Sequence, residues 1–226
     1  MCKVSGHYFA LTDEEKSDLD LPYAKKAFAS SCNDEPGLPN FNLRYEHLHE
    51  VLRDNSFISD EIINAYFYLL WFEIYEEHKE KSVFFFNTYF FAILAKDFEK
   101  AVLFKGRFSD YDLIFMPVHV HGNHWTLYVI DPAKQEIRYY DSLGGIYSFG
   151  DSLILRFLSH WSSFPGNWTI NRPVTKLQEK NDCGIFVLRY AVHESHDLPI
   201  DFGQDEITLF RPRVVYDIFV AGKITL

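Results

Sequence analysis

The sequence predicts an α+β fold in which three consecutive strands are preceded and followed by helices. Three apolar segments of strand length, 111–117, 124–130 and 136–140, follow one another with short turns between them. A strongly periodic helical segment precedes them, and a long, mostly apolar segment that we interpret as a helix follows them. A length of 226 residues and a hydrophobic fraction of 47% fit one such unit with a substantial core.

The composition excludes several classes of protein. A net charge of −10 does not suit nucleic acid binding, which needs clustered Lys and Arg, and favours a partner with a basic face. The three cysteines, Cys2, Cys32 and Cys183, form no CxxC pair, so we expect neither a disulfide scaffold nor a zinc site. Neither a secretory signal nor a membrane span is expected. These features predict an intracellular protein of the nucleus or cytoplasm, or of a host cell if it is a secreted effector.

The elements before the strands are predicted as follows. Residues 1–40 are expected to form an extension with a short helix over Pro22–Ser30, and residues 41–226 the folded domain. Phe41–Leu52 has the pattern of a weak amphipathic helix or turn. A long helix starts at Ser59 or Asp60, both good N-caps, and ends within Glu76–Lys81. A second helix is expected over Asn87–Phe98.

The three strands place two polar residues together. Tyr111–Pro117, His124–Ile130 and Glu136–Tyr140 read as an antiparallel meander, with Asp131 and Pro132 in a turn. His124 begins one strand and Asp141 follows its neighbour. In an antiparallel hairpin these positions lie at the same edge of the sheet, so we expect His124 and Asp141 to be neighbours.

The elements after the strands include a candidate nucleophile. A helix is expected over Asp151–Ser162 and a short strand over Asn167–Asn171. The buried helix then begins at or just after Cys183, where the helix dipole favours a thiolate. A last helix over Glu206–Val220 has Pro212 near its start or in a break.

A nucleophilic thiol needs a base, a group that orients the base, and donors for the oxyanion. We assign Cys183 as the nucleophile, His124 as the general base and then acid, and Asp141 as the orienting group. The side-chain amide of Gln178 and the backbone N–H of Cys183 are the expected oxyanion donors. Gly184 is expected to leave room for a substrate carbonyl. The alternatives are a buried structural cysteine and an ordinary turn aspartate.

The motifs HGNHWTLYVID, YYDSLGG and QEKNDCGIFVLRYA resemble those of the ubiquitin-like-protein proteases, the SUMO-specific (sentrin-specific) cysteine proteases akin to adenoviral protease. FISDEIINAYFYLL and ITLFRPRVVYDI are similar to the family's first core helix and its C-terminal helix. The resemblance covers about residues 41–222. It implies a papain-like fold and a thiol isopeptidase that cleaves after the Gly-Gly end of a modifier, without metal or cofactor.

The resemblance also implies substrate-binding residues. Trp125 and Phe57 would enclose the Gly-Gly tail, and Asp60, beside its capping role, would contact an arginine of the modifier. Phe57 stands where the family usually has Trp. Gln178 lies five positions before Cys183, whereas the family usually has six, a position occupied here by Leu177. We keep Gln178 because leucine cannot donate a hydrogen bond.

SUMO is the modifier that we expect as partner of a monomeric enzyme, with no nucleic acid or membrane involved. Ubiquitin or another ubiquitin-like modifier is the alternative with the same chemistry. An acetyltransferase that uses acetyl-coenzyme A on the same His–Asp–Cys arrangement is an alternative of another class. A catalytically inactive binding module is the third.

Overall fold

The computed structural model describes residues 11–13, 16, 43–78, 80–103, 108–160 and 167–224. The predicted helix Pro22–Ser30 and the predicted domain boundary after residue 40 lie outside these residues. In chain order the main elements are α3 (Tyr45–Leu52), α4 (Asp60–Glu77), β1 (Val83–Phe85), α5 (Phe90–Lys96), α6 (Phe98–Ala101), the 3₁₀ turn η1 (Phe108–Asp110), β2 (Leu113–Val120), β3 (His124–Asp131), β4 (Glu136–Tyr140), α7 (Ser148–Ser159), β5 (Thr169–Asn171), α8 (Cys183–Ser195) and α9 (Gln204–Ile224).

The five strands form one mixed sheet in the order β1-β2-β3-β4-β5. β2, β3 and β4 are the predicted antiparallel meander, and β1 and β5 add to its two edges in parallel. The meander lies at the centre of the sheet because its strands are the longest and most apolar.

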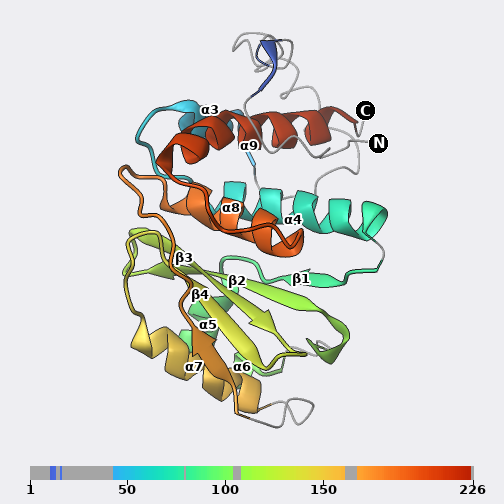
Figure 1. Ribbon diagram of the computed structural model, residues 1–226, viewed down its shortest axis with the longest axis vertical. Helices are drawn as coiled ribbons and strands as arrows, with labels where there is room; N and C mark the ends of the chain where they lie inside the picture. Colours follow the sequence, from blue (N-terminus) through green and yellow to red (C-terminus); the bar gives the residue numbers. More distant parts are fainter. Residues whose placement is uncertain are drawn as a thin grey trace.

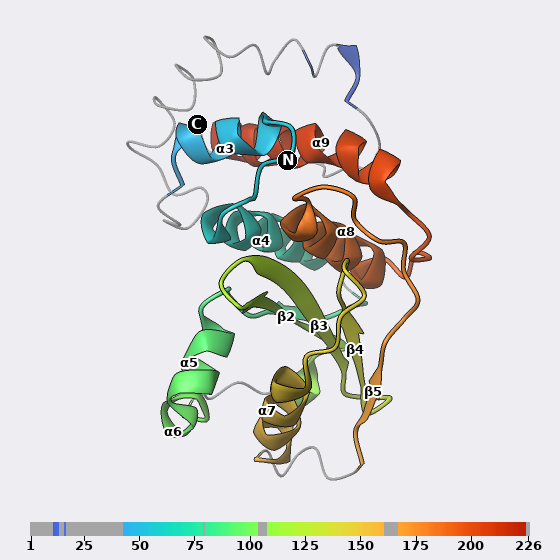
Figure 2. The same ribbon diagram turned by 90° about the vertical axis from the view of Figure 1, so that its left-hand side faces the viewer.

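Helices cover both faces of the sheet (Figures 1 and 2). α4 and α8 lie on one face with α3 and α9 behind them, and α5, α6 and α7 lie on the other. The strand residues alternate between the two resulting cores: Phe115, Leu127 and Val129 belong to the core with α4 and α8, whereas Met116 and Tyr128 belong to the core with α5 and α7. An α+β fold with a mixed sheet flanked by helices is confirmed.

Several boundaries differ from the predictions. β1 was not predicted, because Val83–Phe85 lies in a run of consecutive apolar residues without alternation. The helix predicted over Asn87–Phe98 is two helices, α5 and α6, divided at Asp97, whose side chain accepts a hydrogen bond from the Lys100 N–H (3.1 Å) and so caps α6. α7 begins three residues before the predicted Asp151.

The last helix is longer than predicted and has no break. α9 continues through Pro212, which cannot donate a backbone hydrogen bond. Buried residues such as Phe210 and Val214 hold α9 on both sides of the proline. Among the described residues, we find no helix with the length and apolar character needed to cross a membrane.

Candidate active site

The N-terminus of α8 carries Cys183, which is the first residue of the helix and a free thiol with 1% of its surface exposed. The helix is buried on nearly every side because it packs on β3 of the sheet, lies beside α4 and is covered by α9 (Figure 2). The sulfur is therefore held at the positive end of a helix dipole inside the protein, where an anion is stabilised.

The edge of the sheet brings His124 to Asp141. Leu127 pairs with Tyr140 across β3 and β4, so the first residue of β3 and the residue after β4 lie at one edge. There His124 Nε2 and Asp141 Oδ1 are 2.7 Å apart. Cys183 lies close enough to His124 to help raise the pKa of its imidazole. Since Nε2 faces Asp141, Nδ1 is the ring nitrogen available to the sulfur.

The charges of this trio support one another. Burial would lower the pKa of His124, but the hydrogen bonds and charges of Asp141 and Cys183 outweigh burial and raise that pKa from 6.5 to about 9. Burial would raise the pKa of Asp141, but its hydrogen bond to His124 and the backbone N–H groups of Leu143 and Gly145 lower it. At neutral pH the arrangement therefore favours an imidazolium at His124 beside an ionised Asp141.

The turn after β4 depends on a glycine next to Asp141. A Cβ at Gly145 would lie only 2.6 Å from Asp141 Oδ2, and the Gly145 N–H helps to lower the pKa of Asp141. The sequence shows this glycine only as part of a turn. The structure shows that its lack of a side chain lets the turn close on the carboxylate.

Gly145→Ala is expected to displace the Asp141 carboxylate from His124 and to lower the rate of substrate cleavage by about tenfold, since small misplacements of reacting groups are costly. Gly144→Ala is the matched control. Gly144 has a φ of +70°, so an alanine there also strains the backbone. The added Cβ, however, would meet Leu177 rather than Asp141. Steady-state kinetics and urea unfolding of both variants separate the effects, and an equal loss of rate in both would contradict this role of Gly145.

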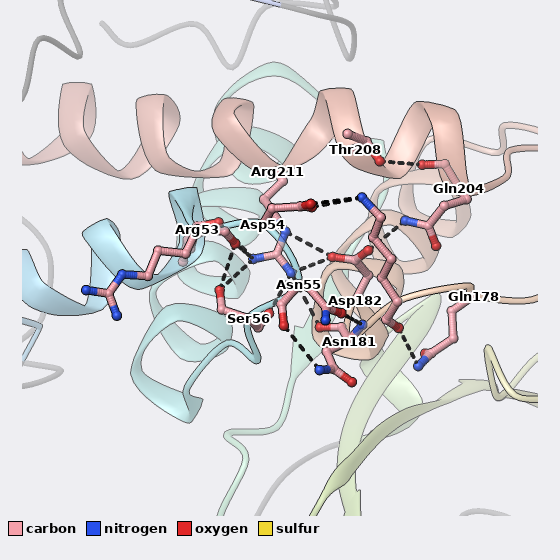
Figure 3. Close-up of polar contacts among 12 residues, drawn as sticks. Arg53, Asp54, Asn55, Ser56, Gln178, Asn181, Asp182, Gln204, Thr208 and Arg211 are labelled. Atoms are coloured by element: carbon pink, nitrogen blue, oxygen red, sulfur yellow. Dashed lines mark hydrogen bonds and ion pairs between the residues drawn. The ribbon is translucent and has the colours of Figure 1, made fainter.

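Gln178 lies beside the residue that follows Asp141. Its side-chain Oε1 accepts a hydrogen bond from Ser142 Oγ (2.6 Å), and its backbone N–H donates to the Ser142 carbonyl (2.8 Å). Its Nε2 donates to the Lys180 carbonyl at 2.9 Å (Figure 3). The amide is thus fixed in the loop before α8, and a primary amide still has a second N–H to offer.

Trp125 is held next to the nucleophile's helix. Its indole Nε1 donates to the Ile58 carbonyl (3.2 Å), and its ring stacks on His119 with centroids 4.3 Å apart. Trp125 itself is 6% exposed, whereas Phe57, the residue before Ile58, is 52% exposed. The structure therefore places the two aromatic residues on adjoining segments, one buried and one at the surface.

The structure shows that Gly184 has a packing role. A Cβ at this position would overlap Ile58 Cγ1, and it would lie 2.7 Å from Ile58 Cδ1 and 3.3 Å from Trp125 Cδ1. The space left by the missing side chain is thus filled by Ile58 and Trp125. Gly184 thereby lets these side chains pack on α8, and its role beside a substrate carbonyl stays a prediction.

Asp60 is the first residue of α4 and has a partner that the sequence did not indicate. The Tyr89 hydroxyl donates to the Asp60 carboxylate, and this bond raises the pKa of Tyr89 to about 12. His119 lies close enough to sense the charges of Asp60 and His124. Asp60, Tyr89 and His119 therefore form a polar group near Trp125. Tyr89 belongs to no recognisable motif, so the sequence alone could not have identified it.

In the part of the chain that the structure describes, we find no group of three or more His, Cys, Asp or Glu side chains that could hold a metal ion. Cys183, His124 and Asp141 bring together a thiol, an imidazole and a carboxylate. This arrangement can perform nucleophilic acyl transfer.

Comparison with known proteins agrees with this chemistry. Residues 56–222 match the model of the Ulp1 protease family, C-terminal catalytic domain. The chain is 28% identical over 239 residues to the ubiquitin-like-specific protease ESD4 of Arabidopsis thaliana, covering 93% of this chain and 47% of that protein. It is 31% identical over 186 residues to human sentrin-specific protease 2, covering 75% of this chain and 31% of that protein. The chain thus spans about half or less of the length of these relatives.

Solved structures share the fold. The catalytic domain of the Ulp1-like SUMO protease of Chaetomium thermophilum has a TM-score of 0.77 at 18% identity, covering 94% of this chain and 90% of that chain. The Ulp1 protease domain in complex with Smt3, the yeast ortholog of SUMO, has a TM-score of 0.72 at 21% identity, covering 94% and 96%. With the family model matched over 56–222, the chain belongs to the Ulp1 protease family.

Proposed function

We propose that this chain is a thiol isopeptidase and endopeptidase that cleaves the bond after the C-terminal Gly-Gly of SUMO, in precursors and on target lysines. The observation that carries the proposal is the contact of His124 with both Asp141 and Cys183 in a member of this family. The names of the relatives, and the Ulp1 domain solved with Smt3, support SUMO as the modifier. The match to a protease family disfavours the acetyltransferase alternative.

In the first half of the reaction the Cys183 thiolate attacks the carbonyl carbon after Gly-Gly and forms a C–S bond. The oxyanion of the tetrahedral intermediate accepts hydrogen bonds from the Cys183 backbone N–H and the second N–H of the Gln178 amide. When the intermediate collapses, the C–N bond breaks. The His124 imidazolium gives its proton to the leaving amine, and a thioester remains on the enzyme.

In the second half, neutral His124 takes a proton from water while the water oxygen attacks the thioester carbonyl. The C–S bond then breaks, the Gly-Gly tail leaves as a carboxylic acid that gives its proton to solvent, and the thiolate forms again beside the imidazolium. Asp141 keeps Nε2 protonated and Nδ1 directed at the sulfur throughout. All groups that move protons in this cycle belong to the chain or to water.

Substrate selection follows from the segment before α4. Trp125 and Phe57 would enclose a tail without side chains, which explains a requirement for Gly-Gly, and Asp60 would bind a basic residue of the modifier. A net charge of −10 favours a basic face on SUMO. The enzyme would act as a monomer, in the nucleus or cytoplasm where SUMO conjugates are found.

The test is a panel of modifiers that carry a C-terminal electrophile in place of the scissile bond. The purified chain is incubated separately with SUMO and ubiquitin probes, and adducts are measured by intact mass. We expect a covalent adduct with the SUMO probe on Cys183, and none in Cys183→Ser. A ubiquitin adduct without a SUMO adduct would show that the modifier is ubiquitin rather than SUMO. Absence of any adduct at a folded protein would reject the protease function.

A further inference from the structure

The last helix, α9, carries a buried arginine directly behind the nucleophile's helix. Arg211 is 5% exposed. Its Nε lies 2.9 Å from Asp182 Oδ1, and its Nη2 binds the same oxygen. Gln204, the first residue of α9, donates to the other oxygen, Asp182 Oδ2, at 2.6 Å (Figure 3). Both oxygens of the Asp182 carboxylate are therefore held by α9.

These contacts keep Asp182 from its usual task at a helix start. An N-cap aspartate normally accepts hydrogen bonds from the first N–H groups of its own helix. Asp182 is the N-cap of α8, yet its side chain makes no capping hydrogen bond. The N–H groups of Gly184 and Ile185, at the second and third positions of α8, are therefore not occupied by this carboxylate, and the positive end of the helix beside Cys183 can receive an oxyanion.

The same guanidinium also fixes the segment that leads to the substrate-binding residues. Nη1 donates to the Val51 carbonyl at 2.8 Å and to Ser56 Oγ at 3.2 Å, and Nη2 donates to the Ser56 carbonyl at 2.7 Å. Phe57 and Ile58 follow immediately. Arg211 thus joins the start of α8 to the segment whose Ile58 carbonyl holds Trp125.

We propose that Arg211 is a positioning residue for the reaction. It pulls the Asp182 carboxylate away from the N-terminus of α8 and neutralises it, so that the Cys183 thiolate and its neighbouring N–H groups are presented to the substrate carbonyl. Arg211 does not touch the substrate. This inference rests on the proposed function only for the role of Cys183 as nucleophile.

The proposal predicts opposite effects for the two halves of one ion pair. Without Arg211, a buried carboxylate next to Cys183 lacks its counter-ion and disfavours a second negative charge on the sulfur. Without the Asp182 charge, the guanidinium has no counter-ion at this place and favours the thiolate. A role confined to stability would give both variants the same sign.

Other charged groups near this pair come from several elements and stay unchanged in both variants. They are His124 on β3, Asp141 after β4, and the exposed ion pair between Lys180 and Asp54, 2.9 Å apart. The Arg53 side chain points away from the cluster (Figure 3). A difference between the variants can therefore be attributed to Arg211 and Asp182.

The experiment measures the alkylation rate of Cys183 by iodoacetamide against pH, by intact mass, in a chain with Cys2→Ser and Cys32→Ser. It needs no modifier, so its outcome is independent of SUMO. Arg211→Met is expected to move the acid limb of the profile up by about one pH unit, and Asp182→Asn to move it down by about one, from the interaction of unit charges across a few ångströms of protein.

Arg213→Met is the matched control. Arg213 lies on the same helix, is also 5% exposed, and pairs with the buried Asp217 at 2.7 Å. Its loss should lower the urea midpoint as Arg211→Met does but leave the alkylation profile in place. The proposal is overturned if Arg211→Met and Asp182→Asn move the profile in the same direction or not at all, or if Arg213→Met moves it equally.

Two further outcomes remain decisive. If Arg211→Met does not fold, the downward shift in Asp182→Asn, which retains the arginine, supports the proposal, and its absence overturns it. If the wild-type chain forms no adduct with SUMO probes while the two profiles shift in opposite directions, the modifier is wrong and the positioning role of Arg211 stands.

Discussion

His124→Gln is expected to lower the rate of SUMO cleavage by about 1,000- to 10,000-fold, because it removes both the cation that stabilises the thiolate and the acid that protonates the leaving amine. Single-turnover kinetics on a SUMO precursor measures this loss. His121→Asn is the control. His121 lies in the turn before β3 with a φ of +52°, a conformation that asparagine tolerates. A comparable loss of rate in the control would contradict the assignment of His124.

The same variant should change how stability depends on pH. The pKa of His124 is raised to about 9 in the folded protein from 6.5, so the folded state binds this proton more tightly than the unfolded chain does. The stabilisation is complete below about pH 6.5 and is lost as the pH rises through about 9. Urea midpoints of wild type and His124→Gln should therefore converge between pH 6 and pH 10. A constant difference would contradict the raised pKa.

Gly184→Ala is expected to destabilise the protein by about 1–3 kcal/mol, because the new Cβ would overlap Ile58 Cγ1 and lie 2.7 Å from its Cδ1 in a fully packed core. Equilibrium urea unfolding measures the loss. The displaced Ile58 also carries the carbonyl that holds Trp125. The rate of SUMO cleavage should therefore fall together with stability, which a purely local clash would not cause.

A double-mutant cycle identifies Ile58 as the source of this clash. Ile58→Ala alone opens a cavity and costs about 2–5 kcal/mol, but in the Gly184→Ala background it removes both crowding atoms. The double variant should be more stable than the sum of the two losses predicts, by at least about 1 kcal/mol. Ile62→Ala, which truncates a buried isoleucine of α4, is expected to be additive with Gly184→Ala. Additivity in both pairs would reject the contact.

Much of the fold could be predicted because the meander has a strong pattern. The strand Glu136–Tyr140 was predicted with its observed bounds, and its register with β3 follows from short turns. β1 was missed because Val83–Phe85 lies in a run of consecutive apolar residues, which shows no alternation that would identify a strand. The division at Asp97 was missed because local capping overrides helix propensity there, and the continuous passage of α9 through Pro212 was one of two possibilities left open, decided by tertiary burial.

The candidate site could be predicted where its residues lie on strands that are adjacent in the sheet or at the start of a recognisable helix. His124 and Asp141 lie on adjacent strands, and Cys183 lies at the start of a recognisable apolar helix, so the sequence indicated all three, and their catalytic roles are the proposal tested above. Tyr89 and Arg211 carry no local signal. Arg211 meets a partner 29 positions away, and such a pairing depends on how helices pack rather than on any pattern in the chain.

The position of Arg211 in the chain has a consequence for biosynthesis. On a ribosome, Cys183 and its helix are made before α9, so a nascent chain contains Asp182 without the guanidinium that compensates it. The start of α8 can reach its final form only once α9 has been translated and has docked. If Arg211 positions the nucleophile as proposed, competence for catalysis is thereby linked to the synthesis of α9.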